Sequence, residues 1–154
     1  MRVSLLVIGR PRHAGLADAI RDYEMRAARY WPLDVFEVKE ESGRGLTPSL
    51  VMDREAGRLA ERIPADACIV ACDPGGDSMD SSKFASWLQE QREAARAVAF
   101  VIGGAHGLGE AIRKRSTRRL SLAPWTLPHE VARLVLSEQL YRAGTIIRGE
   151  PYHK

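Results

Sequence analysis

Short apolar runs alternate along the chain with longer segments in which apolar residues recur every three to four positions. The run at 98–102 is apolar at every position, which is typical of a strand covered by helices on both faces. The apolar runs predict strands at 3–8, 33–38, 67–72, 97–102 and 120–123, and the periodic segments predict helices near 14–30, 49–63, 81–96, 107–116 and 129–147. This alternation predicts a single α/β domain over residues 1–154, with a mostly parallel sheet flanked by helices.

The last predicted helix carries apolar residues in two stripes. One stripe contains Val131, Leu134 and Val135. The other contains Leu136, Leu140, Ala143 and Ile147. A helix that covers a sheet needs one such stripe. The second stripe indicates either a partner subunit, and so a homodimer, or a helix buried deep within the monomer, and the pattern favours neither.

Charge is distributed unevenly along the chain. Residues 1–112 carry 14 Lys and Arg against 17 Asp and Glu, whereas residues 113–154 carry 9 against 3. This asymmetry indicates a polyanionic partner for the C-terminal third. The two cysteines, Cys68 and Cys72, lie four residues apart on one predicted strand, too far for an easy disulfide. Free thiols, and apolar runs too short to span a membrane, favour a cytoplasmic protein with no membrane association.

A glycine-rich segment, Gly103 to Gly107, follows directly after the fourth predicted strand. Glycines at such a place let a ligand approach the backbone, and amides at the start of the next helix can bind polar groups. The segment fits neither the dinucleotide fingerprint nor a phosphate loop, which ends in Gly-Lys-Ser/Thr. A plain strand-to-helix turn is the other interpretation, and the glycine count alone does not decide between them.

Two prolines, Pro124 and Pro128, bracket the segment between the fifth strand and the last helix. They fix the backbone and predict a rigid loop whose amides and carbonyls can face a ligand. A simple helix stop with Trp125 in the core is the alternative. The helix then opens on His129-Glu130, but Arg133 stands where a zinc helix would need its second histidine, so we expect no metal site.

A basic run ends the fourth predicted helix, and basic residues recur at the C-terminus. Such a run is either a solvated helix face or a surface that contacts RNA phosphates. The candidate RNA-binding residues are Arg113, Lys114, Arg115, Arg118, Arg119, Arg148 and Lys154. The terminal sequence Tyr152-His153-Lys154 could be a frayed end, or it could stack a base, move a proton and hold a phosphate.

Four motifs, in order and at these spacings, resemble the ribosomal large subunit methyltransferase H family, the pseudouridine-N3 enzymes of the SPOUT class. The motifs are Ile102-Gly103-Gly104-x-x-Gly107-Leu108, Ser121-Leu122 through Thr126-Leu127-Pro128-His129, Glu138-x-Leu140-Tyr141-Arg142-Ala143, and Pro151-Tyr152-His153-Lys154. The resemblance covers the whole chain. The sequence departs from the common pattern at Ala105-His106, where Pro and Glu are frequent, so position 106 lacks the acidic residue of that pattern.

The resemblance implies a SPOUT-type α/β fold with a C-terminal trefoil knot, a homodimer, and S-adenosyl-L-methionine as cofactor. It also implies methylation of N3 of a pseudouridine in 23S ribosomal RNA of the assembled ribosome. Carried over by position, the cofactor-binding residues are Cys72, Asp73, Gly103, Gly104, Ala123, Pro124, Trp125, Thr126, Leu127 and Pro128. A non-catalytic RNA-binding ribosome assembly factor with the same fold is an alternative. A nucleotide-binding switch domain is disfavoured, because the glycine segment lacks phosphate-loop chemistry.

The chemistry that the resemblance implies assigns candidate catalytic roles. The N3 nitrogen must lose its proton to become a good nucleophile, and His153 is the first candidate base, with His129 the second. Tyr152 would position the pseudouridine base of the RNA, and Arg142 would neutralise the negative charge on that base. The tail would complete the cofactor site of the opposite subunit.

Overall fold

The computed structural model describes residues 1–153; the side chain of His153 and all of Lys154 lie outside the described part. In chain order the elements are β1 (Val3–Ile8), α1 (Ala14–Ala27), β2 (Leu33–Val38), α2 (Pro48–Ala60), β3 (Cys68–Ser78), α3 (Ser81–Glu93), β4 (Val98–Ile102), α4 (Glu110–Arg115), β5 (Arg118–Ser121), α5 (His129–Ile147) and the 3-10 helix η1 (Pro151–His153). The predicted alternation of strands and helices is confirmed.

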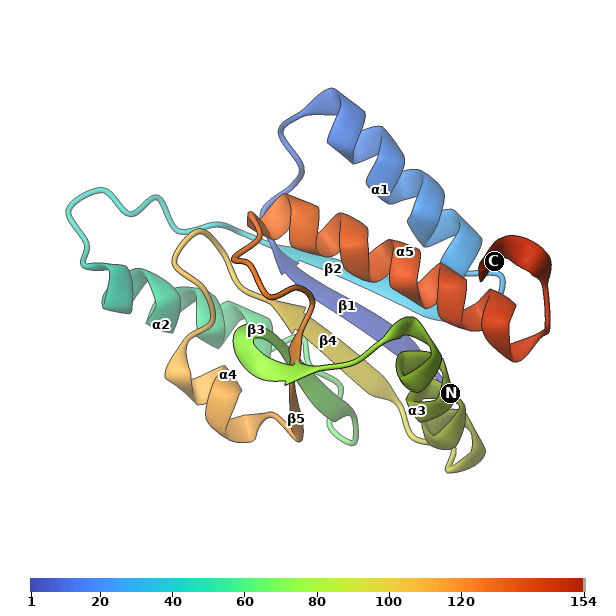
Figure 1. The fold of residues 1–154 in the computed structure, drawn as a ribbon. Coiled ribbons are helices and arrows are strands. Elements are labelled where there is room, and N and C mark those ends of the chain that lie inside the picture. The colour runs from blue at the N-terminus through green and yellow to red at the C-terminus, as the bar shows by residue number, and fades with distance from the viewer. Residues whose placement is uncertain (154) are drawn as a thin grey trace.

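The strands form one sheet in the order β2-β1-β4-β3-β5, and every neighbouring pair is parallel. Helices α1, α3 and α5 cover one face of the sheet, and α2 and α4 cover the other (Figure 1). This arrangement explains the unbroken burial of β1 and β4, whose side chains meet helices on both sides. Because the strands are parallel, the loops that follow β3, β4 and β5 gather at one edge of the sheet.

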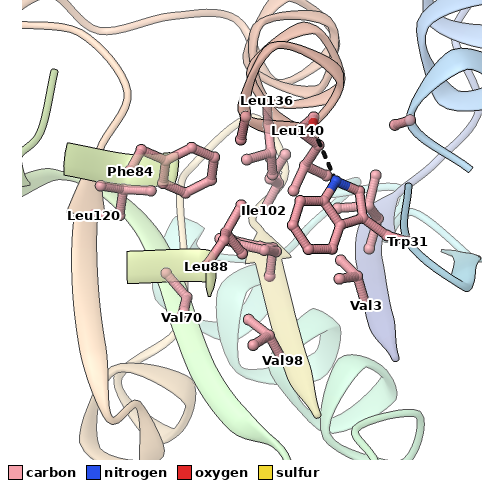
Figure 2. Close-up of a cluster of buried hydrophobic side chains, with 14 of the residues drawn as sticks. Val3, Trp31, Val70, Phe84, Leu88, Val98, Ile102, Leu120, Leu136 and Leu140 are labelled. Carbon is pink, nitrogen blue, oxygen red and sulfur yellow. Dashed lines mark hydrogen bonds between the residues drawn. The ribbon is translucent and has the colours of Figure 1, made fainter. Parts of the chain in front are cut away.

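Each face of the sheet has its own apolar core. On the α5 side, Phe84 and Leu88 of α3 pack with Leu136 and Leu140 of α5 over the sheet (Figure 2). Trp31 closes this core, and its indole Nε1 donates a 2.9 Å hydrogen bond to the carbonyl oxygen of Leu140. The bond satisfies the one polar atom of a side chain that is otherwise buried in apolar surroundings. It also fixes α5 against the loop before β2.

Two helices begin at residues whose side chains cap the backbone. Thr47 accepts a hydrogen bond from the amide of Leu50 at the start of α2, where Pro48 takes the first position. Asp80 accepts one from the amide of Lys83 at the start of α3. Both caps satisfy amides that have no partner within the helix, and proline is well suited to the first helical turn. These signals fix where both helices start.

The third strand is longer than predicted. It continues to Ser78, and its register shifts so that Cys72 and Asp77 both pair with Leu120 of β5. The residues between them bulge out of the ladder. A Cβ on Gly76 would lie 2.6 Å from the backbone carbon of Arg119, so the two strands can approach this closely only where that residue is glycine.

The basic run was predicted at the end of a helix, and this is wrong for its second half. Helix α4 ends at Arg115, whereas Arg118 and Arg119 begin β5. The chain passes from helix to strand at Thr117, whose amide donates to the carbonyl oxygen of Ile69 on β3 and so starts the pairing of β5 with β3. A local charge pattern gave no sign of this distant partner.

Helix α5 matches its predicted bounds of 129–147, and its two apolar stripes have different surroundings. Leu136, Leu140 and Ala143 are buried against the sheet, whereas Leu134 and Val135 are half-buried. Among the described residues, no helix is long and apolar enough to cross a membrane. The α/β class with a parallel sheet between helices is confirmed; the trefoil knot stays a prediction.

Candidate functional site

A cleft of about 680 Å³ lies where the loops after β3, β4 and β5 meet. Its wall contains Cys72 and Asp73 from β3, the glycine segment after β4, and the proline-bracketed loop after β5. Of the ten predicted cofactor-binding residues, all but Pro124 line it. Parallel sheets commonly bind ligands at this edge, because the loops there surround a crevice beyond the strand ends.

The glycine segment folds back on itself at the mouth of β4. Gly104 and Gly107 form an antiparallel bridge, in which the Gly107 amide donates to the Gly104 carbonyl oxygen at 3.0 Å. A Cβ on Gly103 would lie 2.4 Å from the Gly107 backbone, and a Cβ on Gly104 would lie 2.6 Å from Oε2 of Glu55. The sequence left open whether these glycines make room for a ligand or form a plain strand-to-helix turn. The structure shows that they are needed first for the close packing of the loop itself.

Asp73 is buried in the cleft wall with an exposed fraction of 7%. The Gly75 amide donates to Oδ1 at 2.9 Å, while Arg113 Nε and Arg119 Nη2 lie 2.9 and 3.3 Å from Oδ2. Burial alone would raise the pKa of Asp73, but the Gly75 amide and the two guanidinium groups outweigh it and lower that pKa. The cleft wall therefore holds an ionised carboxylate whose charge is compensated by the guanidinium groups of Arg113 and Arg119.

Cys72 lies beside Asp73 and has different chemistry. Desolvation raises the pKa of its thiol to about 12, so the group stays protonated at neutral pH. A protonated thiol is a poor nucleophile, which leaves Cys72 as part of the apolar wall. Both cysteines are free.

The proline-bracketed loop is held at its start and exposed in its middle. Ser121 Oγ donates to the carbonyl oxygen of Ala123 at 2.7 Å. Trp125 is 77% exposed, so the alternative that placed it in the core is wrong. Pro128 directly precedes α5, and His129 is the first residue of that helix and lines the cleft. One predicted catalytic residue thus lies beside the predicted cofactor loops.

Arg133, which replaces the second histidine of a zinc helix, has a structural role. It is buried, and its guanidinium binds Glu24 of α1 and Glu37 of β2, each at 2.8 Å. Burial would lower the pKa of Arg133, but its bonds to the two carboxylates outweigh this and raise it. Within the described part of the chain, no group of three or more histidine, cysteine or acidic residues is arranged to hold a metal ion.

The predicted RNA-binding run is divided between two environments. Arg113 and Arg119 are the counterions of Asp73, and Lys114 lies 4.0 Å from Glu110. Arg115 is exposed, and Arg118 lies over the ring of Trp87 at 5.6 Å. The run therefore borders the cleft as well as facing outward, and its contact with RNA stays a prediction.

The tail lies against the C-terminal half of α5. The Tyr152 hydroxyl donates to Glu138 Oε1 at 3.0 Å and lies 3.3 Å from the hydroxyl of Tyr23. Arg142 donates to the same Glu138 oxygen at 2.6 Å and lies over the Tyr152 ring. Burial, with these hydrogen bonds, raises the pKa of Tyr152, which remains a neutral phenol. The side chain of the catalytic candidate His153, and the whole of the RNA-binding candidate Lys154, lie outside the described part of the chain.

The three catalytic candidates whose side chains the structure describes, His129, Arg142 and Tyr152, do not meet within one chain. Arg142 follows His129 by 13 residues on the same helix, which places it about 20 Å further along the axis. Figure 1 shows the C-terminus at the end of α5 that is remote from the loop before α5. His129 therefore lies at the cleft, whereas Arg142 and Tyr152 lie at the opposite end of the helix.

Three residues of these sites were not identified as functional from the sequence. Glu138 binds both Arg142 and Tyr152, and its spacing of four residues from Arg142 on a helix was an available signal. Tyr23 contacts the tail from α1, and Glu55 contacts the glycine segment from α2. Neither carries a local sequence signal, because both contacts join segments far apart in the chain.

Comparison with known proteins gives one consistent family. The model of the family described as "Predicted SPOUT methyltransferase" matches residues 1–153. A curated relative from Gemmatimonas aurantiaca, named ribosomal RNA large subunit methyltransferase H, is 79% identical over all of both chains. Its counterpart of the same name from Syntrophotalea carbinolica is 39% identical over 99% of each chain.

Solved structures agree at the level of the fold. A probable methyltransferase from Bordetella pertussis Tohama I superposes with a TM-score of 0.56 at 18% identity, covering 93% of this chain and 94% of the other. A probable methylase family protein from Haemophilus influenzae gives 0.51 at 14% identity, covering 99% and 70%. With the family match, these confirm the predicted SPOUT fold class. The chain belongs to the SPOUT methyltransferases and, among them, to the ribosomal RNA large subunit methyltransferase H family.

Proposed function

We propose that this protein transfers a methyl group from S-adenosyl-L-methionine to N3 of a pseudouridine in 23S ribosomal RNA of the assembled ribosome. The observation that carries the proposal is the cleft after β3, β4 and β5, found in a chain 79% identical to a protein named ribosomal RNA large subunit methyltransferase H. A ribosomal substrate would make the protein cytoplasmic.

The cleft suits the cofactor in size and in chemistry. Its volume of about 680 Å³ lies within the range of roughly 300–1,000 Å³ that is usual for small-molecule sites. Ile102, Leu127 and Ala132 supply apolar surface for an adenine ring, and Asp73 supplies an acceptor for polar groups. The backbone of the proline-bracketed loop can hold the methionyl part. When bound, the cofactor supplies a methyl group that is already activated for transfer.

The protein groups have to align the nucleophile, remove a proton and exclude water. His129 faces the cleft and is the candidate base within one subunit, and His153 is the candidate from the tail. Tyr152 is a neutral phenol whose hydroxyl donates to Glu138, so its ring is the part that can contact a nucleobase. Arg142 keeps its positive charge, since its bond to Glu138 raises its pKa, and it can stabilise the N3 anion.

The separation of these groups supports a homodimer with a shared site. With Arg142 and Tyr152 about 20 Å along α5 from His129, the tail serves a cleft if that cleft belongs to a second subunit. An open groove of about 310 Å³ beside α5, lined by Met79, Leu122 and Val135, offers apolar surface for such a partner. Lys114, Arg115, Arg118 and Arg148, with Lys154, would hold RNA phosphates around the shared site.

The test is methyl transfer by the purified protein. Tritium-labelled cofactor is supplied with 70S ribosomes, 50S subunits or free 23S RNA, each from cells that lack the modification. We expect label in the 23S RNA of 70S ribosomes and far less in the other two. Ribosome binding without cofactor binding in calorimetry, and without label, would instead support the non-catalytic assembly factor.

A further inference from the structure

Glu55, in the middle of α2, has a buried carboxylate of which one oxygen has a hydrogen-bond partner and the other has none among the described residues. The residue is 3% exposed. Its Oε1 accepts a 3.0 Å hydrogen bond from the Glu41 amide, whereas Oε2 has no hydrogen-bond partner among the residues that the structure describes. A carboxylate withdrawn from water in this way is costly unless another charge or a donor compensates it.

The two arginines on the same helix do not provide that compensation. Arg58 lies 2.5 Å, and Arg54 3.8 Å, from the carboxylate of Glu41. Within the described part of the chain, Glu55 belongs to no ion pair. The acidic residue of the cleft wall, Asp73, differs in this respect, because Arg113 and Arg119 neutralise it. Glu55 therefore has no cationic partner among the residues that the structure describes.

The place of this charge relates it to the cofactor. Gly104 lines the cleft, and a Cβ built on it would lie 2.6 Å from Glu55 Oε2. Helix α2 can pack this close because Gly109 also lacks a side chain, where a Cβ would lie 2.8 Å from Ala56. Only the Gly104 backbone thus separates the carboxylate from the cleft. Little water can screen a charge across that layer.

We propose that Glu55 is a positioning residue whose charge makes the cleft prefer the cationic sulfonium cofactor over the neutral thioether that remains after transfer. The inference rests on the proposed function. In that reaction the N3 electron pair forms the new N–C bond, the sulfur keeps the pair of the broken S–C bond, and the N3 proton leaves to the base. The positive charge on sulfur disappears in this step. The attraction to Glu55 disappears with it, which favours release of the product.

The test compares two ligands that differ by that charge, S-adenosyl-L-methionine and S-adenosylhomocysteine, by titration calorimetry. Glu55→Gln keeps the shape of the side chain and removes the charge. We expect it to weaken sulfonium binding on the order of tenfold and to change thioether binding by less than about twofold. The matched control is Asp53→Asn, which removes an exposed charge from the same helix and should change neither affinity.

Equal losses for both ligands would show that Glu55 only shapes the loop, and would overturn the proposal, as would unchanged binding of both. The wild-type protein gives a second comparison that does not depend on folding of the variant. It should bind the sulfonium more tightly than the thioether, and equal or reversed affinities would contradict the inference. A wild-type protein that binds neither ligand would instead contradict the proposed function.

Discussion

Arg113 Nε lies 2.9 Å from Oδ2 of Asp73, and this contact joins the basic run of α4 to the wall of the proposed cofactor cleft. Asp73 is buried, whereas the Arg113 side chain is 37% exposed. The arginine thus has one end of its guanidinium at the cleft and another toward solvent, where RNA would approach. A residue predicted to bind phosphate has a second role, which is to keep a cleft carboxylate ionised.

Arg113→Ala should lower the free energy of unfolding at pH 7 by about 1 kcal/mol, because Arg119 still compensates Asp73. The folded protein lowers the pKa of Asp73, so this contribution is present above the ordinary pKa of about 3.9 and is lost as the pH falls through the folded-state pKa. Denaturant titrations from pH 7 to pH 2.5 should show the two proteins converging below about pH 4. The exposed neighbour Arg115→Ala is the control. A difference that stays constant to pH 2.5 would contradict the assignment.

Gly103→Ala should destabilise the protein by about 1–3 kcal/mol and abolish cofactor binding, because the new Cβ would lie 2.4 Å from the Gly107 backbone. Gly57→Ala on α2 is the matched control, since a Cβ there meets nothing within 4 Å. It should be neutral or stabilise the helix by up to about 1 kcal/mol. Thermal unfolding and calorimetry on both variants measure this. Normal cofactor binding by Gly103→Ala would remove the glycine segment from the site.

The purified protein should have twice the 17.1 kDa mass of one chain in light scattering at micromolar concentration. Val135→Glu places a charge in the apolar groove beside α5 and should shift the mass toward the monomer and reduce methyl transfer. Met25→Glu, at an exposed apolar position on α1, should change neither. A monomeric wild-type protein that transfers methyl groups would refute the shared site.

Two inactive variants should restore activity when their subunits are exchanged. One lacks residues 152–154, and the other carries Ala123→Arg in the cleft, with its loss of cofactor binding verified by calorimetry. A mixed dimer has one cleft from the truncated chain and one tail from the blocked chain, which make one complete site. The truncated protein should still bind the cofactor nearly as well as the wild type. Failure of the mixture to transfer tritium would place the tail at its own cleft or outside the reaction.

The spacing of apolar residues was sufficient to predict most of the fold. The bounds of β1, β2 and α5 agree with the prediction, because the spacing of apolar residues within each segment marks it. The continuation of β3 to Ser78 could not be predicted, since Gly75, Gly76 and Asp77 show no strand pattern. That segment pairs because the backbone of β5 approaches it. The length of a strand and its register with a neighbour depend on such distant contacts, which local sequence patterns do not contain.

The site was predictable where a loop follows a strand, and not where a side chain reaches it from elsewhere. The glycine and proline signals, with the family resemblance, located the cleft wall. Glu55 and Tyr23 lie on amphipathic helices where an acidic or aromatic residue is ordinary. Their importance comes from Gly104 and Tyr152, about 50 and 130 positions away, which α2 and α1 bring into contact.

The central claim is the reaction itself, and mass spectrometry of 23S ribosomal RNA tests it most directly. Ribosomal RNA is purified and digested from three samples. One is a strain in which the gene is deleted, the second is that strain carrying the wild-type gene, and the third is that strain carrying the Ala123→Arg cleft variant. We predict that one pseudouridine lacks its N3 methyl group in the deletion strain and is therefore about 14 Da lighter, that it regains the group with the wild-type gene, and that it lacks the group with the variant. Full methylation of that pseudouridine in the deletion strain would contradict the account.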